Sequence, residues 1–253
     1  MNDVSAHLLK TAVHGRYLLR PSGGTAPVPL LAGFHGYGET AEDEMTRLVS
    51  IAGSSGWSLC SIEALHRFRN AKGASGASWM TSHQRDLRIV ENAAYVDAVL
   101  DEAMRHCGSS GPLVLHGFSQ GAAMASRAAV LGRHAVCAVM LLGGDIPPEL
   151  DGLGRMGLVH FARGSRDPLY TETAFKRDVA KLADAGVPCC AVTFTGSHGA
   201  NEEYVLRAGE FLRQFSDQRF SPCSTACRDL PNCIPPRGGP RPAPHAPGRQ
   251  NAT

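Results

Sequence analysis

Apolar residues in this chain gather in short runs that predict buried β-strands. Within each run most residues are aliphatic or small, without a strict alternation of apolar and polar positions. These runs cover residues 17–20, 28–34, 57–62, 112–116, 136–142, 158–162 and 189–194. Strands that are apolar on both faces are typical of a parallel sheet covered on both sides.

Between these runs the apolar residues recur with the period of a helix. The segments predicted to be helical are 41–51, 86–104, 122–130, 171–185 and 201–215. Thr40 is placed to cap the first of them, and acidic residues in its first turn suit the helix dipole. Alternating strands and helices favour an α/β fold with a mostly parallel central sheet and helices on both faces. The Gly- and Ser-rich stretch from Glu63 to Gln84 has neither period, and we expect it to be irregular.

Composition divides the chain into a globular part and a tail. The chain has 253 residues, of which 43% are hydrophobic and 19% charged, enough for one sizeable core. From residue 216 onward the pattern changes, because half of the sixteen prolines lie there beside Gly and Arg. We therefore expect one folded domain without a large lid over 1–215 and a disordered tail over 216–253.

Charge and targeting signals narrow the choice of partners. The net charge is +2, but the tail carries +3 and the rest −1, so nothing favours nucleic acid or an anionic membrane. Neither a signal peptide nor a membrane-spanning run is apparent, and we expect a cytoplasmic protein without stable membrane insertion. The eight cysteines lack zinc-like spacing, and four fall in predicted strands, so no metal is expected.

The pentapeptide Gly117-Phe118-Ser119-Gln120-Gly121 is the strongest chemical signal. A predicted strand precedes it and a small-residue helix follows. This Gly-x-Ser-x-Gly spacing fits the sharp turn that exposes a nucleophilic serine, because the glycines remove side chains that would clash there. The same letters also fit a Gly-rich turn with an ordinary exposed serine, so partners elsewhere must decide.

Two further residues follow later strands in the expected chain order. Asp167 comes after the strand 158–162, and His198 lies in a Gly/Ser loop after the strand 189–194. A histidine here can take the proton of Ser119, and a carboxylate can orient the histidine. The order Ser, Asp, His is that of an α/β-hydrolase. Asp145, after the preceding strand, remains an alternative acid, while Asp167 and His198 could also be a turn and a surface residue.

Acyl transfer also needs two backbone N–H groups directed at the developing oxyanion. Gln120, just after the candidate nucleophile, is placed to supply one. The Gly-rich segment His35-Gly36-Tyr37-Gly38-Glu39, after the second predicted strand, can supply the other from Tyr37. Such a segment also occurs in plain turns.

These motifs together resemble the phospholipase/carboxylesterase family of α/β-hydrolases, which includes the acyl-protein thioesterases. The resemblance covers about residues 15–215 and rests on the motifs at 34–39, 117–121, 142–147, 164–168 and 197–199. It implies a triad of Ser119, Asp167 and His198, an oxyanion hole from Tyr37 and Gln120, and no cofactor. It also implies that Trp79 lines the acyl pocket. The chain departs from the family at Glu39, where Asp is usual, around Asp167, and in the loop 63–84.

The expected function is that of a serine hydrolase that cleaves carboxylic esters or acyl thioesters through an acyl-enzyme on Ser119. The expected partner is a small or lipid-like ester, and a homodimer remains open. A lysophospholipase and an acyl-protein thioesterase are alternatives within the same chemistry. A binding protein on the same fold without catalysis, and a serine peptidase, are the alternatives from other classes.

Overall fold

The computed structural model describes residues 4–23, 27–69, 73–215 and 233–234, and a central sheet of eight strands runs through this part of the chain. The strand order is β1-β3-β2-β6-β7-β8-β9-β10. β1 and β10 run antiparallel to β3 and β9, and the other neighbours are parallel. The strands are β1 (Arg16–Arg20), β2 (Val28–Phe34), β3 (Ser58–Glu63), β6 (Ser109–Phe118), β7 (Ala138–Leu142), β8 (Leu158–Gly164), β9 (Cys189–Phe194) and β10 (Cys233–Ile234).

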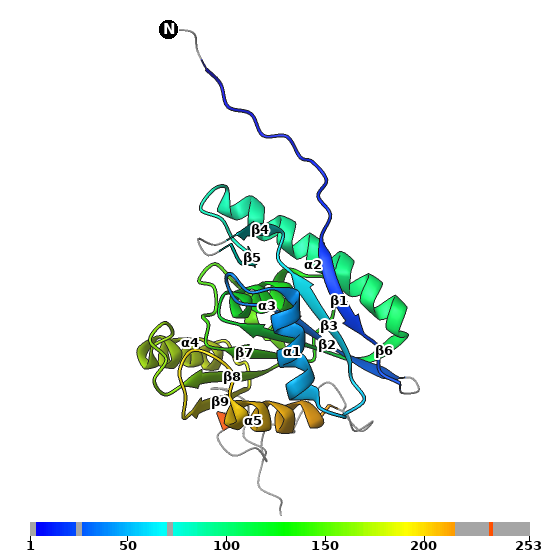
Figure 1. The fold of residues 1–253 in the computed structure, drawn as a ribbon. Coiled ribbons are helices and arrows are strands. Elements are labelled where there is room, and N and C mark those ends of the chain that lie inside the picture. The colour runs from blue at the N-terminus through cyan, green and yellow to red at the C-terminus, as the bar shows by residue number, and fades with distance from the viewer. Residues whose placement is uncertain (1–3, 24–26, 70–72, 216–232, 235–253) are drawn as a thin grey trace, which may run out of the picture.

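Helices cover both faces of this sheet (Figure 1). α1 and α5 pack against each other on one face, and α2, α3 and α4 lie on the other. The helices are α1 (Ala41–Ala52), α2 (Arg85–Cys107), α3 (Gln120–Leu131), α4 (Glu172–Asp184) and α5 (Glu202–Arg213), with a 3-10 turn η1 (Leu153–Met156). The predicted α/β architecture with a mostly parallel sheet is confirmed.

The strands are buried on both faces because successive side chains enter two separate apolar clusters. On β2, Leu30 and Phe34 pack with α2 and α3, whereas Leu31 packs on the side of α1 and α5. The central strands β6 and β7 divide their side chains in the same way. This explains why the sequence shows near-continuous apolar runs there rather than alternation.

α1 begins where the sequence predicts it. Thr40 caps the helix, since its hydroxyl accepts from the Asp43 N–H while the Asp43 carboxylate accepts from the Thr40 N–H at 2.8 Å. Such a reciprocal pair satisfies two N–H groups that the first helical turn leaves without partners. The cap predicted at Thr40 is therefore confirmed.

The stretch 63–84 is more ordered than predicted. It contains an antiparallel hairpin of β4 (His66–Arg69) and β5 (Ser75–Ser78). The expectation of an irregular segment is wrong there, because short strands of Gly, Ser and Arg carry no apolar period. The hairpin lies against the turn after β2: the Gly38 N–H donates to the Ala77 carbonyl at 2.9 Å, and the Ala77 N–H donates to the Glu39 carbonyl at 3.0 Å.

Of the segment after residue 215, the described residues are Cys233–Ile234, which form β10 at the edge next to β9. Composition predicts disorder over 216–253, and apart from these two residues that range lies outside the described part of the chain.

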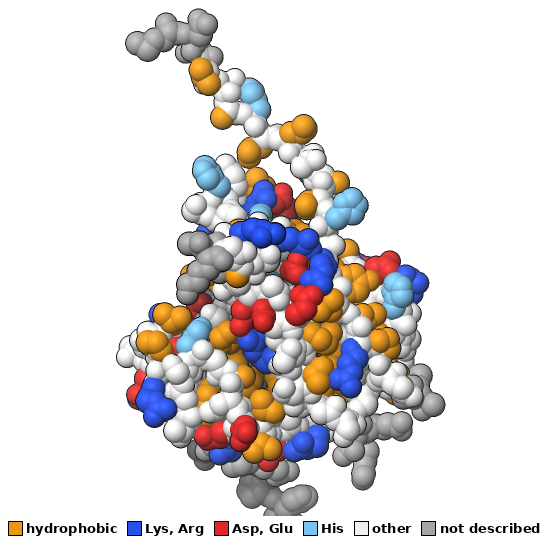
Figure 2. Space-filling view, in the orientation of Figure 1, with side chains coloured by type: hydrophobic (Ala, Val, Ile, Leu, Met, Phe, Trp, Pro, Cys, Tyr) orange, Lys and Arg blue, Asp and Glu red, His pale blue; other side chains and the backbone are white. Residues whose placement is uncertain are grey.

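Charges of both signs are mixed on the face of the molecule shown in Figure 2. Arg16 and Arg67 both pair with Glu63, and Arg16 also contacts Glu42. None of the helices in the described part of the chain has the length and apolar character to cross a bilayer. Among the same residues, no three His, Cys, Asp or Glu side chains are grouped as metal ligands.

Candidate active site

Ser119 lies at the sharp turn between β6 and α3. Its backbone has φ 53° and ψ −117°, a conformation that non-glycine residues rarely adopt. The two flanking glycines make this turn feasible. A Cβ on Gly121 would lie 1.9 Å from the Phe34 carbonyl oxygen, and one on Gly117 would lie 2.3 Å from the Gly121 carbonyl oxygen. The predicted strand–turn–helix context of the serine is therefore present.

Three side chains meet at this turn. His198, in the loop after β9, has its Nε2 2.9 Å from the Ser119 Oγ and its Nδ1 2.8 Å from the Asp167 Oδ2. The carboxylate can only accept a hydrogen bond, so Nδ1 carries the proton and Nε2 accepts from the serine hydroxyl. The chain order Ser, Asp, His thus becomes one continuous line of hydrogen bonds. Its three members come from loops at the carboxyl ends of β6, β8 and β9.

Asp167 is held by main-chain hydrogen bonds. Its Oδ1 accepts from the N–H groups of Leu169 and Tyr170, each at 2.9 Å, which leaves Oδ2 for His198. The Asp167 side chain is 1% exposed. Asp145, the alternative acid, is exposed and makes no hydrogen bond to His198 within the described chain. The geometry selects Asp167 as the partner of the histidine.

The two backbone N–H groups expected to bind an oxyanion belong to Tyr37 and Gln120. Neither donates a hydrogen bond to another residue in the described ranges. The turn that carries Tyr37 is closed by the Glu39 N–H, which donates to the Gly36 carbonyl at 3.2 Å. The side chain of Gln120 is engaged elsewhere, since its Oε1 accepts from the Trp79 N–H at 2.9 Å.

The structure places Trp79 differently from the expectation. Its side chain is fully buried in the core and is not among the residues that line the cavity at Ser119. The indole N–H donates to the His35 carbonyl at 3.0 Å, and its ring lies against Phe34. Trp79 therefore contacts the turn after β2 from the side of the core. The family pattern identified an aromatic residue in this loop but not the direction of its side chain.

A cavity of about 330 Å³ opens beside Ser119 and His198. Its wall includes four residues that sequence reasoning missed: Leu169, Tyr170, Ala174 and Arg177. The spacing of 174 and 177 places them on one face of α4. That spacing is visible in the sequence, but only the fold shows that this face borders Ser119.

The charged groups near this cavity are mostly neutralised. Arg177 pairs with Asp178 at 3.0 Å, and the Tyr170 hydroxyl donates to the same carboxylate at 2.8 Å. Burial, together with this carboxylate, raises the pKa of Tyr170 far above its usual range, so its hydroxyl stays protonated. Of the described charged residues in the wall, Asp145 and Arg177 carry opposite signs.

The sheet and the turn at Ser119 define the α/β-hydrolase fold, and comparison with solved structures agrees. Esterase PE8 superposes with a TM-score of 0.64 and 21% identity, covering 80% of this chain and 100% of its own. A carboxylesterase from Mesorhizobium loti superposes with a TM-score of 0.66 and 18% identity, covering 81% of this chain and 97% of its own. SOBER1 from Arabidopsis thaliana superposes with a TM-score of 0.58 and 17% identity, covering 75% of this chain and 97% of its own. No family model and no curated protein sequence matches the chain. At these identities the likeness concerns the fold.

Proposed function

We propose that this protein is a serine hydrolase of the phospholipase/carboxylesterase type that cleaves carboxylic esters. The observation that carries the proposal is the hydrogen-bonded line from Ser119 through His198 to Asp167, which ends at an open cavity. The named esterases among the structural neighbours support the same chemistry.

The geometry suits a two-step acyl transfer. Ser119 Oγ attacks the ester carbonyl while His198 Nε2 takes the hydroxyl proton, and Asp167 stabilises the imidazolium. The N–H groups of Tyr37 and Gln120 bind the oxyanion of the tetrahedral intermediate. Nε2 then returns the proton to the departing alcohol, leaving an acyl-enzyme. Water, deprotonated by the same nitrogen, releases the acid and restores the serine.

The cavity favours a short acyl group. Its volume is small, and its wall mixes the exposed Leu169 with the charged Arg177 and Asp145. A long acyl chain needs a deep apolar channel to stay out of water, and Trp79, the expected lining of such a channel, is enclosed in the core. We therefore infer that the preferred substrate is a small ester. Small acyl thioesters rank second as substrates, and lysophospholipids and acylated proteins rank last.

A chain-length series tests this proposal. We expect p-nitrophenyl acetate and butyrate to be hydrolysed with a higher kcat/KM than the octanoate and palmitate. Thioesters of the same acyl groups should be hydrolysed with a lower kcat/KM than the corresponding esters. Ser119→Ala should lower kcat by about four to six orders of magnitude, whereas Ser126→Ala, on α3 but not in the wall of the cavity, should stay within about twofold. Equal activity of both variants would contradict the assignment.

A further inference from the structure

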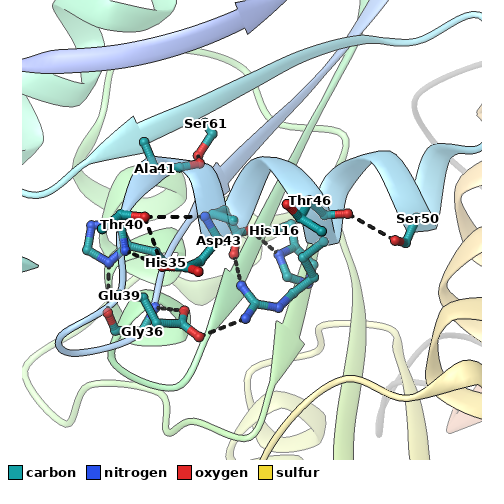
Figure 3. Close-up of polar contacts among 12 residues, drawn as sticks. His35, Gly36, Glu39, Thr40, Ala41, Asp43, Thr46, Ser50, Ser61 and His116 are labelled. Carbon is teal, nitrogen blue, oxygen red and sulfur yellow. Dashed lines mark hydrogen bonds and ion pairs between the residues drawn. The ribbon is translucent and has the colours of Figure 1, made fainter. Parts of the chain in front are cut away.

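Glu39 closes the turn that presents Tyr37. Its Oε2 accepts from the Gly36 N–H at 2.8 Å, while its own N–H donates to the Gly36 carbonyl at 3.2 Å. Gly36 is thus bound at both its polar backbone atoms by one residue. The close-up in Figure 3 shows the Glu39 side chain turned back toward Gly36 below His35. The N–H of Tyr37, next to Gly36, is the atom that this closure orients.

Arg47 on α1 holds Glu39 in this position. Its guanidinium donates to the Glu39 Oε1 at 2.9 Å and also contacts the Glu44 carboxylate. The side chains of Arg47 and Glu44 are 11% and 0% exposed. Burial by itself would lower the pKa of Arg47, but the two carboxylates outweigh it and raise this pKa. The cation therefore keeps its charge throughout the working pH range.

Arg47 also contacts the other half of the site. Its guanidinium carbon lies 4.4 Å from the centre of the Phe118 ring, and Phe118 directly precedes Ser119. The Phe118 ring in turn lies 5.0 Å, centre to centre, from the ring of His198. One buried cation thus touches the turn after β2, the residue before the nucleophile and, through that residue, the histidine.

The position of Arg47 is fixed from below by a second set of contacts. Glu44 Oε1, the carboxylate oxygen that does not contact Arg47, lies 2.6 Å from His116 Nδ1 on β6. His116 Nε2 lies 2.9 Å from the Tyr204 hydroxyl on α5. Gly33 on β2 leaves room for this carboxylate, because a Cβ there would lie 2.5 Å from Glu44 Oε1. α1 cannot shift along the sheet without breaking these bonds.

From these contacts we propose that Glu39 is a positioning residue for the oxyanion hole and that Arg47 is its fixed counterion. The proposal rests on the proposed esterase function, because it assigns to Glu39 the task of aiming the Tyr37 N–H at the substrate oxyanion. Glu39 does not touch the substrate. Its effect should therefore fall on kcat, where the oxyanion forms, rather than on KM.

The test compares Glu39→Ala and Glu39→Gln with Asp43→Asn in the full chain. Asp43 is a matched control, since its carboxylate also accepts a main-chain N–H at the start of α1 but contacts neither Gly36 nor Arg47 among the described residues. With p-nitrophenyl acetate we expect Glu39→Ala to lower kcat about 10- to 100-fold with KM within about threefold. Glu39→Gln, which keeps an acceptor for Gly36 but not the charge, should fall in between, and Asp43→Asn should stay within about twofold.

A second measurement does not depend on activity. Exchange of the Gly36 amide with D2O, followed by NMR, should be slow in the wild type and in Asp43→Asn and at least about tenfold faster in Glu39→Ala. If the wild type hydrolyses no ester, the proposed function is wrong, while the Gly36 amide still reports whether Glu39 holds the turn. Unchanged Gly36 exchange in Glu39→Ala, or a loss of kcat no larger than that of Asp43→Asn, would overturn the inference. Should Glu39→Ala fail to fold, the kcat of Glu39→Gln decides: this variant loses the charge that pairs with Arg47, and a loss of kcat no larger than that of Asp43→Asn would overturn the inference.

Discussion

The loops that carry Asp167 and His198 follow β8 and β9, whereas the turn that carries Tyr37 follows β2, on the other side of β6 in the sheet. Asp167 is oriented by the main-chain N–H groups of Leu169 and Tyr170, which follow it closely in the sequence. The turn at Tyr37 is instead held by an ion pair from α1 and by hydrogen bonds from the β4–β5 hairpin. The same site thus combines a locally encoded half with a half that depends on distant contacts.

The local half can be broken by changing the acid. Asp167→Asn keeps the shape of the side chain but favours the wrong tautomer of His198, and we expect kcat to fall by about four orders of magnitude. Asp145→Asn is the matched control at the cavity wall and should change kcat less than about threefold. Steady-state kinetics with p-nitrophenyl acetate measure both. A larger loss for Asp145→Asn would assign the acid to the loop after β7.

The distant half can be broken at Arg47. Arg47→Met leaves the Glu44 carboxylate buried beside an apolar side chain, and we expect the free energy of unfolding to fall by about 3 to 5 kcal/mol. Arg105→Met removes a comparable pair with Glu102 on the surface of α2 and should leave the urea midpoint unchanged. Urea denaturation followed by circular dichroism measures the difference. Equal midpoints for the two variants would show that Arg47 adds nothing beyond a surface pair.

A smaller, pH-dependent effect is expected at His160 on β8. Its ring packs against Tyr204, which ends the chain of contacts from Arg47, and neither ring nitrogen has a hydrogen-bond partner among the described residues. Burial, with a further contribution from the nearby His116, lowers the pKa of His160 to about 3. An unfolded histidine titrates near pH 6.5, so the folded state binds fewer protons. Stability is therefore complete above about pH 6.5 and declines as the pH falls toward 3.

His160→Phe isolates this contribution. Between pH 6 and pH 4 the wild type should lose up to about 1.4 kcal/mol more of its unfolding free energy per pH unit than the variant, because one extra proton binds on unfolding. His106→Gln, on the exposed end of α2, should keep the wild-type slope. Urea titrations at three pH values measure these slopes. Parallel curves for the wild type and His160→Phe would mean that His160 is not kept neutral by burial.

The sequence predicted the sheet well because its strands are buried on both faces. The apolar runs at 28–34 and 189–194 coincide with β2 and β9, and the cap at Thr40 marks the start of α1. The hairpin β4–β5 was missed, since Gly, Ser and Arg form strands there only by pairing with each other and with the turn after β2. The pattern of apolar and polar residues within a short segment does not indicate such pairing.

The candidate site divides along the same line. Ser119, Asp167 and His198 could be placed from the sequence because each directly follows a predicted strand, and parallel strands bring their carboxyl ends to one edge. The structure brings these three into hydrogen-bond contact; their catalytic roles remain predictions. The side-chain direction of Trp79 and the partners of Glu39 could not be predicted, because both depend on contacts between segments far apart in the chain.

The sequence by itself determined the order of the helices and of the parallel strands along the chain, the sharp turn at Ser119 and the chain order of its two partners. These features follow from local preferences: apolar runs, caps, and glycines where a side chain would collide with the backbone. Tertiary structure alone decided which acid meets His198, where Trp79 lies, and how Arg47 ties the turn at Glu39 to Phe118. A buried charge or aromatic ring takes its role from whatever surrounds it, and those surroundings exist only once the chain has folded.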